Sequence, residues 1–322
     1  MKVVVLGAGA MGFLYGLTLQ EAGVKVDFVE PYQPSYDALK AQGGVLVSRN
    51  GEGEHLVPVN VYTPEEYHET PDLMVVFVKQ MQTQSAMERS QHFLGPDTYL
   101  LTNQSGLGAV EVLEQFDPRQ QIVAGTAYGA SILTAPGKVN LMGKKGGPHA
   151  NFVNATENND QRTQEIAQLF TDANLKATLQ DNYLGTLWDK MMLNSVVNTL
   201  GTLTSATMGE FANFALADQM TKNMVYEGYQ VAEAAGIKML RTADQMVDKI
   251  LTKSKSGNPF HHPSMYQDLK NHRPTEVDYI NGHIVKVARE HGVQAPQHEL
   301  LTQEVHLVEQ LQSGALAVTK EA

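Results

Sequence analysis

The sequence predicts an α/β domain followed by an all-α domain, and three observations support this fold class. Short apolar runs alternate with helical stretches in the first half, which is typical of a parallel, doubly wound sheet. A glycine-rich loop directly follows the first apolar run. From about Asp160 the apolar spacing is helical throughout. We therefore expect two domains, 1–175 and 176–322, and the length of 322 residues agrees with this number.

The first domain is expected to contain a series of core strands and an added hairpin. A helix over Met11–Ala22 joins the first two strands and ends at Gly23. The turn sequence Asn50-Gly51 predicts the hairpin, with strands at Gly44–Ser48 and Leu56–Val61. The core strands are predicted at Lys2–Leu6, Lys25–Glu30, Leu73–Val78, Thr98–Thr102 and Gln121–Ala124.

Helical apolar spacing dominates the rest of the chain. Thr275 or Pro274 can begin one of these helices, with Glu276 and Asp278 in its first turn, where acids suit the helix dipole. This role explains Asp278 adequately and Glu276 only in part. Residues 313–322 are expected to fray. The predicted helices are Thr163–Ala173, Leu184–Leu200, Ala217–Ala235, Ala243–Lys253, Thr275–His291 and Glu299–Gln312.

Composition excludes several classes of function. The formal net charge of −11 argues against a nucleic-acid or anionic-membrane surface, which would need a basic face. The chain has no cysteine, so disulfides and thiolate chemistry cannot be invoked. The eleven histidines show no HExxH spacing, so we expect no metal site. The first strand begins at the N-terminus and no apolar run approaches the roughly 20 residues of a membrane span, so a cytoplasmic enzyme is expected.

The loop Gly7-Ala8-Gly9-Ala10-Met11-Gly12 has the G-x-G-x-x-G spacing of dinucleotide-binding domains. Gly7 permits a tight turn, Gly9 lets the backbone approach a pyrophosphate, and Gly12 lets the helix pack on the strand. The alternative is a purely structural strand-turn-helix. Glu30, which ends the next strand about eighteen residues after Gly12, favours a Rossmann-type domain. The phosphates are then expected at the helix N-terminus, beside Ala10 and Met11.

Several predicted strands end in residues that could contact this cofactor. Gly7, Glu30, Lys79 and the loop 103–108 each follow a predicted strand. Ligands of doubly wound sheets bind beyond the carboxyl ends of the strands, so we expect these residues along one edge.

The helix predicted over Leu184–Leu200 carries a polar stripe. Lys190, Asn194 and Asn198 are four residues apart, and successive members are displaced by only about 40° around the helix axis. Their neighbours are apolar, so the helix is expected to be largely buried, and its polar groups need partners or a ligand. The alternative is a lysine that reaches water and asparagines that bind nearby loops.

The whole chain resembles the ketopantoate reductases (2-dehydropantoate 2-reductases). The similarity rests on GAGAMG, on Lys79 at a strand end, on the run Trp188–Asn198 and on the segment SMYQDLKNHRPTEVDYING from Ser264. The resemblance implies a bound nicotinamide cofactor and a 2-oxo acid substrate. It implies that Lys190 is the general acid and that Glu276 positions it. Asn194 and Asn198 are then expected to line the substrate pocket, and Ser264 to bind the substrate carboxylate. Lys79 is expected near the nicotinamide ribose.

These residue types fit the implied chemistry. Hydride transfer to C2 of a 2-oxo acid leaves negative charge on the carbonyl oxygen, which a protonated Lys190 can stabilise and protonate. A carboxylate such as Glu276 would favour the ammonium form. Neutral serine and asparagine groups can bind a carboxylate through hydrogen bonds.

Three departures from the family pattern bear on cofactor and substrate. Many members place a basic residue where this chain has Glu30, and a carboxylate there would repel a 2′-phosphate, which favours NAD over NADP. Lys25 and Lys40 are the nearby basic residues that could still favour NADP. The family loop Asn-Gly-x-Gly, whose asparagine holds ribose and substrate, reads Ser105-Gly106-Leu107-Gly108, with Asn103 two places earlier. Met208 stands where members can carry a polar asparagine near the substrate.

The sequence therefore looks more like the NAD-dependent D-2-hydroxyacid (D-mandelate-type) dehydrogenase branch. We expect reduction of a branched or aromatic 2-oxo acid to the D-2-hydroxy acid. One alternative is a 2-dehydropantoate 2-reductase that uses NADPH in pantothenate biosynthesis, and another is a non-catalytic dinucleotide-binding sensor. A homodimer is compatible with the apolar helices of the second half.

Overall fold

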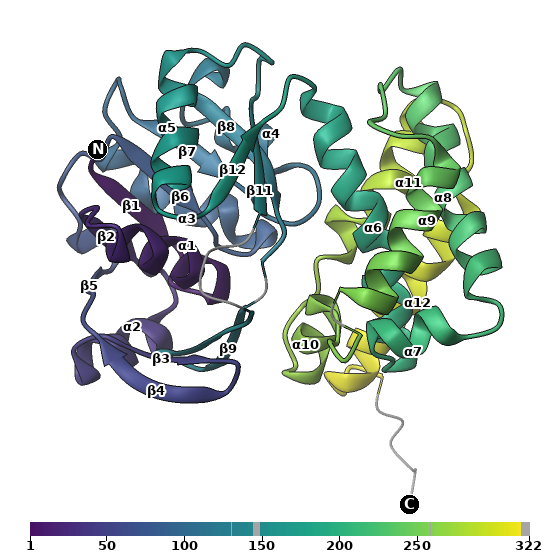
Figure 1. Ribbon diagram of the computed structural model, residues 1–322, viewed down its shortest axis with the longest axis horizontal. Coiled ribbons are helices and arrows are strands. Elements are labelled where there is room, and N and C mark those ends of the chain that lie inside the picture. The colour runs from purple at the N-terminus through teal and green to yellow at the C-terminus, as the bar shows by residue number, and fades with distance from the viewer. Residues whose placement is uncertain (130, 144–148, 258, 317–322) are drawn as a thin grey trace, which may run out of the picture. The chain divides into compact units, whose positions relative to one another are not determined.

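The computed structural model describes residues 1–129, 131–143, 149–257 and 259–316, so the end of the segment predicted to fray lies outside the described residues. The chain forms two compact units, shown in Figure 1. The first contains Met1–Gln104 and Gly108–Tyr183, and the second contains Ser105–Leu107 and the chain from Leu184 onward. The first is α/β and the second is helical, which confirms the predicted fold class.

The first unit is built on an eight-stranded sheet with the order β12-β11-β8-β7-β6-β1-β2-β5. All its pairings are parallel except that of β8 with β11. β1, β2 and β6 are buried along their whole length, which explains their nearly continuous apolar sequences. The strands are β1 (Val3–Leu6), β2 (Val26–Val29), β5 (Asn60–Tyr62), β6 (Leu73–Val76), β7 (Tyr99–Thr102), β8 (Ile122–Ala127), β11 (His149–Asn154) and β12 (Lys176–Leu179).

The predicted hairpin belongs to a second, four-stranded sheet with the order β4-β3-β10-β9. Asn50 and Gly51 have φ values of 52° and 83°, as a two-residue turn with left-handed backbone requires. The predicted single strand Leu56–Val61 was wrong, because β4 ends at Val57 and a separate strand, β5 of the main sheet, begins at Asn60. The strands are β3 (Val45–Arg49), β4 (Glu52–Val57), β9 (Ser131–Ala135) and β10 (Lys138–Leu141).

The helices of the first unit pack against these sheets. α1 contacts β1 and β2 of the main sheet and β9 and β10 of the small sheet. The unit extends to Tyr183 because β12, which follows the predicted boundary, pairs with β11. The helices are α1 (Ala10–Glu21), α2 (Gln33–Gln42), α3 (Thr83–Ser90), α4 (Ala109–Leu113) and α5 (Gln161–Asp172), with short 3-10 helices η1 (Pro64–Glu66), η2 (Gln80–Gln82), η3 (Gln91–Phe93) and η4 (Arg119–Gln121).

Helices are the only regular secondary structure among the described residues of the second unit. The helix predicted to begin at Thr275 begins instead at Asn281, because Ile280 (φ −110°, ψ −89°) separates it from a 3-10 turn. Glu276 and Asp278 thus precede the helix, and Asp278 accepts a hydrogen bond from His306 at 2.8 Å. The elements are α6 (Tyr183–Thr204), α7 (Met208–Asn213), α8 (Ala217–Ala234), α9 (Ala243–Ser256), α10 (Ser264–Lys270), η5 (Val277–Tyr279), α11 (Asn281–Glu290) and α12 (Pro296–Gln312).

Within the described ranges, no helix combines the length and the apolar character that a membrane span needs.

Candidate functional site

The glycine loop has the geometry that its sequence predicts. Gly7 has φ 101°, and a Cβ there would lie 2.7 Å from the backbone nitrogen of Val78. A Cβ on Gly12 would lie 2.0 Å from the carbonyl oxygen of Gly7, so a side chain would separate the helix from the loop. Gly9 instead faces open space. Because α1 begins at Ala10, the free N–H groups of its first turn lie beside this space, as anion binding requires.

The predicted cofactor residues follow neighbouring strands. The strands β7, β6, β1 and β2 are adjacent and parallel in the sheet. Each is followed by one of these residues: β7 by Asn103, β6 by Lys79, β1 by Gly7 and β2 by Glu30. The four residues therefore share the carboxyl edge. The chain order reverses between β1 and β6, and this is where open α/β sheets bind their ligands.

Glu30 is tied to the glycine loop. One carboxylate oxygen accepts a hydrogen bond from the backbone N–H of Ala8 at 2.6 Å, and the other accepts one from Tyr32 at 2.7 Å. The side chain is buried, and burial raises the pKa of Glu30 to about 7, against the two hydrogen bonds, which lower it. Glu30 therefore fixes the position of the loop as well as placing an acid beside it.

Asn103 lies in the interior of the first unit. Its Nδ2 donates to the hydroxyl of Tyr15 at 2.9 Å, and its Oδ1 is buried without a partner among the described residues. The next residue, Gln104, was not predicted as a site residue. It joins two strand ends, because its Nε2 donates to the carbonyl oxygen of Val78 at 2.5 Å and to Thr83 at 2.9 Å.

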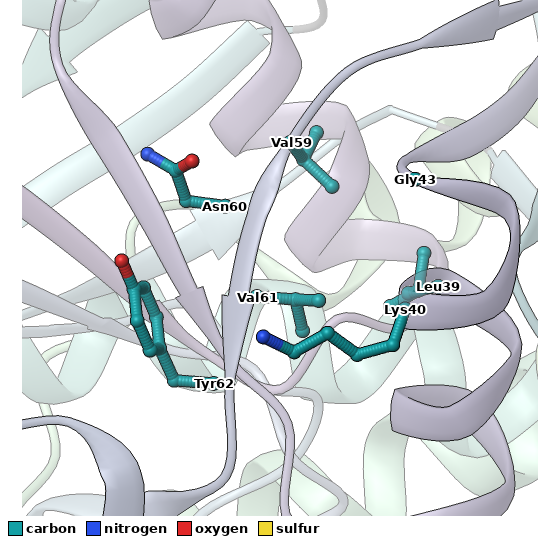
Figure 2. A pocket seen from close by; sticks show the side chains of 7 residues that line it. All are labelled: Leu39, Lys40, Gly43, Val59, Asn60, Val61 and Tyr62. Carbon is teal, nitrogen blue, oxygen red and sulfur yellow. The ribbon is translucent and has the colours of Figure 1, made fainter.

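The two lysines that could favour NADP both have other partners. Lys25 pairs with Glu69 at 3.2 Å. The ammonium of Lys40 lies 5.5 Å from the ring centres of both Tyr36 and Tyr62. Figure 2 shows Lys40 reaching from α2 toward β5, in a pocket of about 160 Å³ that contains no predicted site residue. The pocket is lined by Leu39, Lys40, Gly43, Val59, Asn60, Val61 and Tyr62.

In the second unit, α6 carries the predicted polar stripe. Lys190 is half-buried, and Asn194 and Asn198 are 5% and 6% exposed. The helix around them is buried, including Trp188 and Met192. Two buried carboxamides one turn apart offer donors and acceptors to a ligand along the same stripe as the lysine.

Three charged side chains, those of Asp189, Lys249 and Lys253, act on Lys190, and the sequence did not indicate this role for them. The neighbouring Asp189 is 3% exposed and pairs with both Arg241 and Lys249. Burial, with the positive charges of Lys253 and Lys249, lowers the pKa of Lys190 from 10.5 to about 7, against the opposing charge of Asp189. From the sequence, we expect Glu276 to favour the ammonium form of Lys190. The surroundings of Lys190 instead favour its neutral amine form. The available sequence signal was the four-residue spacing of Lys249 and Lys253, which place both on one face of α9.

Met208 and Ser264, two further predicted site residues, each begin a helix. A backbone hydrogen bond joins Met208 to the segment that precedes Ser264. Met208 begins α7, and its N–H donates to the carbonyl oxygen of His261 at 3.0 Å. Ser264 is exposed and begins α10, a helix that the sequence did not predict. A Cβ on Gly201 of α6 would lie 2.8 Å from Pro263, so α6 also reaches this segment.

The loop of Ser105 belongs to the second unit. Leu107 donates its N–H to the carbonyl oxygen of Tyr279 at 2.9 Å, and Gly106 (φ 88°) lies too close to Tyr279 for any side chain. Glu276, three residues before Tyr279, is 9% exposed. The structure thus brings the loop of Ser105 to the segment of Glu276.

No group of three or more His, Asp or Glu side chains suited to a metal ion is present in the described part of the chain.

Comparisons with known proteins agree with this arrangement. The family model described as "Ketopantoate reductase PanE/ApbA" matches residues 3–148, and "Ketopantoate reductase PanE/ApbA C terminal" matches residues 182–309. The 2-dehydropantoate 2-reductase of Streptococcus pyogenes serotype M3 is 29% identical over 312 residues, which cover 96% of this chain and 98% of the relative. A D-mandelate dehydrogenase solved with NADH and anilino(oxo)acetate is similar with a TM-score of 0.91 at 28% identity, covering 97% and 100% of the two chains. A 2-dehydropantoate 2-reductase from Geobacter metallireducens has a TM-score of 0.86 at 25% identity, covering 95% and 99%.

Proposed function

The chain belongs to the ketopantoate reductase family of NAD(P)-dependent oxidoreductases, which reduce 2-oxo acids, and we propose that it reduces a branched or aromatic 2-oxo acid to the D-2-hydroxy acid with NADH. The observation that carries this proposal is Lys190, with its pKa lowered to about 7, on the same stripe of α6 as two buried carboxamides. A proton donor works best when its pKa lies near the operating pH.

Lys190 acts as the general acid in this proposal. Bound NADH supplies the hydride that reaches C2 of the substrate. The ammonium of Lys190 stabilises the negative charge that develops on the carbonyl oxygen and transfers its proton to that oxygen, which becomes the hydroxyl. Glu276 directs the ammonium, and Asn194 and Asn198 hold the substrate by hydrogen bonds. In the reverse direction, neutral Lys190 takes the proton from the hydroxy acid.

Cofactor choice rests on Glu30. The proposed pyrophosphate site is the glycine loop with the first turn of α1, and it consists of Gly7, Gly9, Ala10, Met11 and Gly12. Lys79, Asn103 and Ser105 are proposed around the nicotinamide ribose. Glu30 can accept hydrogen bonds from the adenosine ribose hydroxyls, and its carboxylate disfavours a 2′-phosphate. The partners of Lys25 and Lys40 support NAD as well, because both lysines are engaged elsewhere.

The choice of substrate depends on the residues proposed to contact the carboxylate and the side chain of the 2-oxo acid. Ser264 is proposed to bind the carboxylate through its hydroxyl. Met208 is apolar and Ser105 is shorter than the asparagines that family members carry at these positions, and both changes suit an apolar substrate side chain. The similarity to a D-mandelate dehydrogenase solved with NADH and anilino(oxo)acetate supports this choice.

Steady-state kinetics test the proposal. Benzoylformate, 2-oxoisovalerate and ketopantoate are each compared with NADH and NADPH, and the product configuration is measured by chiral chromatography. We expect the highest kcat/KM for an aromatic or branched acid with NADH, and a D product. A strong preference for ketopantoate with NADPH would contradict the proposal.

A preference for ketopantoate with NADPH would indicate the alternative function, that of a 2-dehydropantoate 2-reductase. The curated relatives, including those of Streptococcus pyogenes and Lactococcus lactis, are 2-dehydropantoate 2-reductases, which favours ketopantoate as the substrate. A non-catalytic dinucleotide sensor is the remaining alternative, and it predicts NADH binding without turnover of any of the three acids. A homodimer stays a prediction, which sedimentation equilibrium would test.

A further inference from the structure

A buried polar network joins α6 to α11 and α12. Its members are Ser195 and Thr199 of α6, Asn281 of α11 and His298 of α12, and all four residues are 0% exposed. Polar groups at this depth are costly unless they are hydrogen-bonded, so each contact in the network restricts the packing of these helices.

Asn281 is the centre of the network. Its Nδ2 donates to the carbonyl oxygen of Ser195 at 3.1 Å and to Nδ1 of His298 at 3.1 Å. Its Oδ1 lies 3.0 Å from the hydroxyl of Thr199, whose single proton is shared between this oxygen and the carbonyl oxygen of Ser195. Nε2 of His298 donates to the carbonyl oxygen of Met224 in α8 at 3.1 Å. These contacts require a neutral imidazole with its proton on Nε2, and burial lowers the pKa of His298 to about 4, which keeps it neutral.

His298 is itself held at the start of α12. The carboxylate of Glu227 in α8 accepts hydrogen bonds from the backbone N–H groups of His298 at 2.9 Å and Gln297 at 3.0 Å. Met224 and Glu227 are one turn apart on α8, so α8 fixes both the backbone and the ring of His298. The acceptor that His298 offers to Asn281 therefore has a defined position.

The network contacts α6 at the turn that carries the substrate-binding asparagines. Ser195 directly follows Asn194, and Thr199 directly follows Asn198. A contact to both Ser195 and Thr199 fixes the rotation and the axial position of this turn. Asn281 also lies five residues after Glu276, so the same side chain ties the segment of Glu276 to α6. A displacement of about 1 Å at catalytic groups can lower the rate by roughly 100-fold.

We propose that Asn281 and His298 are positioning residues, which hold the polar stripe of α6 and the Glu276 segment in the arrangement that reduction requires. This inference rests on the proposed function, because it concerns the residues assigned to the substrate there.

Two matched pairs of variants test the proposal. Thr199→Val removes the hydroxyl that binds Asn281, whereas Thr202→Val removes a buried hydroxyl of the same helix that has no partner among the described residues. His298→Gln can keep the distal contact to Met224 and loses the acceptor for Asn281. His298→Asn can keep that acceptor and loses the distal contact. Each pair thus separates the network from the general cost of changing a buried side chain.

We expect kcat for 2-oxo acid reduction to fall about 10–100-fold in His298→Gln and severalfold in Thr199→Val. His298→Asn and Thr202→Val should keep kcat within about threefold of the wild type. The Kd for NADH should change little in all four, since the glycine loop, Glu30, Lys79 and Asn103 of the proposed cofactor site lie in the first unit. Equal kcat values within each pair, at similar changes in Tm, would overturn the proposal.

Amide hydrogen exchange separates this inference from the proposed function. An inactive wild type would contradict the proposed function alone. The positioning role still predicts faster exchange at residues 194–199 in His298→Gln than in His298→Asn. Equal exchange in the two variants would contradict the positioning role, whatever the turnover of the wild type.

Discussion

The pH dependence of reduction provides a quantitative test of the environment of Lys190. With a pKa of about 7, Lys190 is about 90% protonated at pH 6 and about 10% protonated at pH 8. The proton donor is therefore lost as pH rises through about 7. We expect kcat/KM for the 2-oxo acid to fall about tenfold per pH unit above that point. A lysine with the ordinary pKa of 10.5 would give a constant rate from pH 6 to 9.

The reverse reaction has the opposite dependence. Oxidation of the hydroxy acid needs neutral Lys190, so its kcat/KM should rise up to about pH 7 and then level off. Initial rates should be measured at saturating cofactor at each pH, because Glu30 also has a pKa raised to about 7 and contacts the loop proposed to bind the cofactor.

Substitution of Lys253 tests the cause of this pKa shift. The groups whose charges act on Lys190 are Lys253, Lys249 and Asp189. Lys253→Met removes one positive charge and should move both pH profiles up by about one unit. Lys255→Met is the matched control, since Lys255 is exposed on the same helix. A profile that is flat to pH 9, or equal shifts in the two variants, would refute the assigned origin of the shift.

Three other substitutions test individual roles. Glu30→Arg should move the ratio of Kd values for NAD and NADP toward NADP, and an unchanged ratio would refute the assigned role of Glu30. Ser264→Ala should raise KM for the acid about fivefold with little change in kcat, as the loss of one neutral hydrogen bond implies; an unchanged KM would exclude it from the carboxylate site. Asp189→Asn leaves two cations without their buried partner and should lower the free energy of unfolding in urea by about 3 kcal/mol. Asp248→Asn, at an exposed position of α9, should change it by less than about 0.5 kcal/mol, and similar losses in the two variants would contradict the role of Asp189.

Local sequence patterns predicted the features whose causes are local. The glycine spacing, the buried strands and the polar stripe of α6 each depend on residues close together in the chain, and the structure contains all three. The place of Glu30 at the end of the second strand could be predicted because its distance from Gly12 is set by one strand-helix-strand unit.

Features that depend on packing between distant segments could not be predicted. Nothing near Lys190 in the sequence indicated that Lys249 and Lys253 of α9 would lower its pKa. The helix expected from Thr275 begins later, because residues 277–279 form a 3-10 turn whose last residue pairs with the Ser105 loop. The amphipathic pattern alone did not distinguish that turn from the first turn of the helix.

The single-turnover rate of Lys190→Ala tests the central claim most directly. Enzyme with bound NADH is mixed with the best 2-oxo acid, and the loss of NADH absorbance is followed in the presence and absence of methylammonium. Loss of a general acid should slow the step by roughly 10²–10⁴-fold, and the added amine should restore part of the rate. A rate equal to that of the wild type would contradict the assignment of Lys190 as the proton donor.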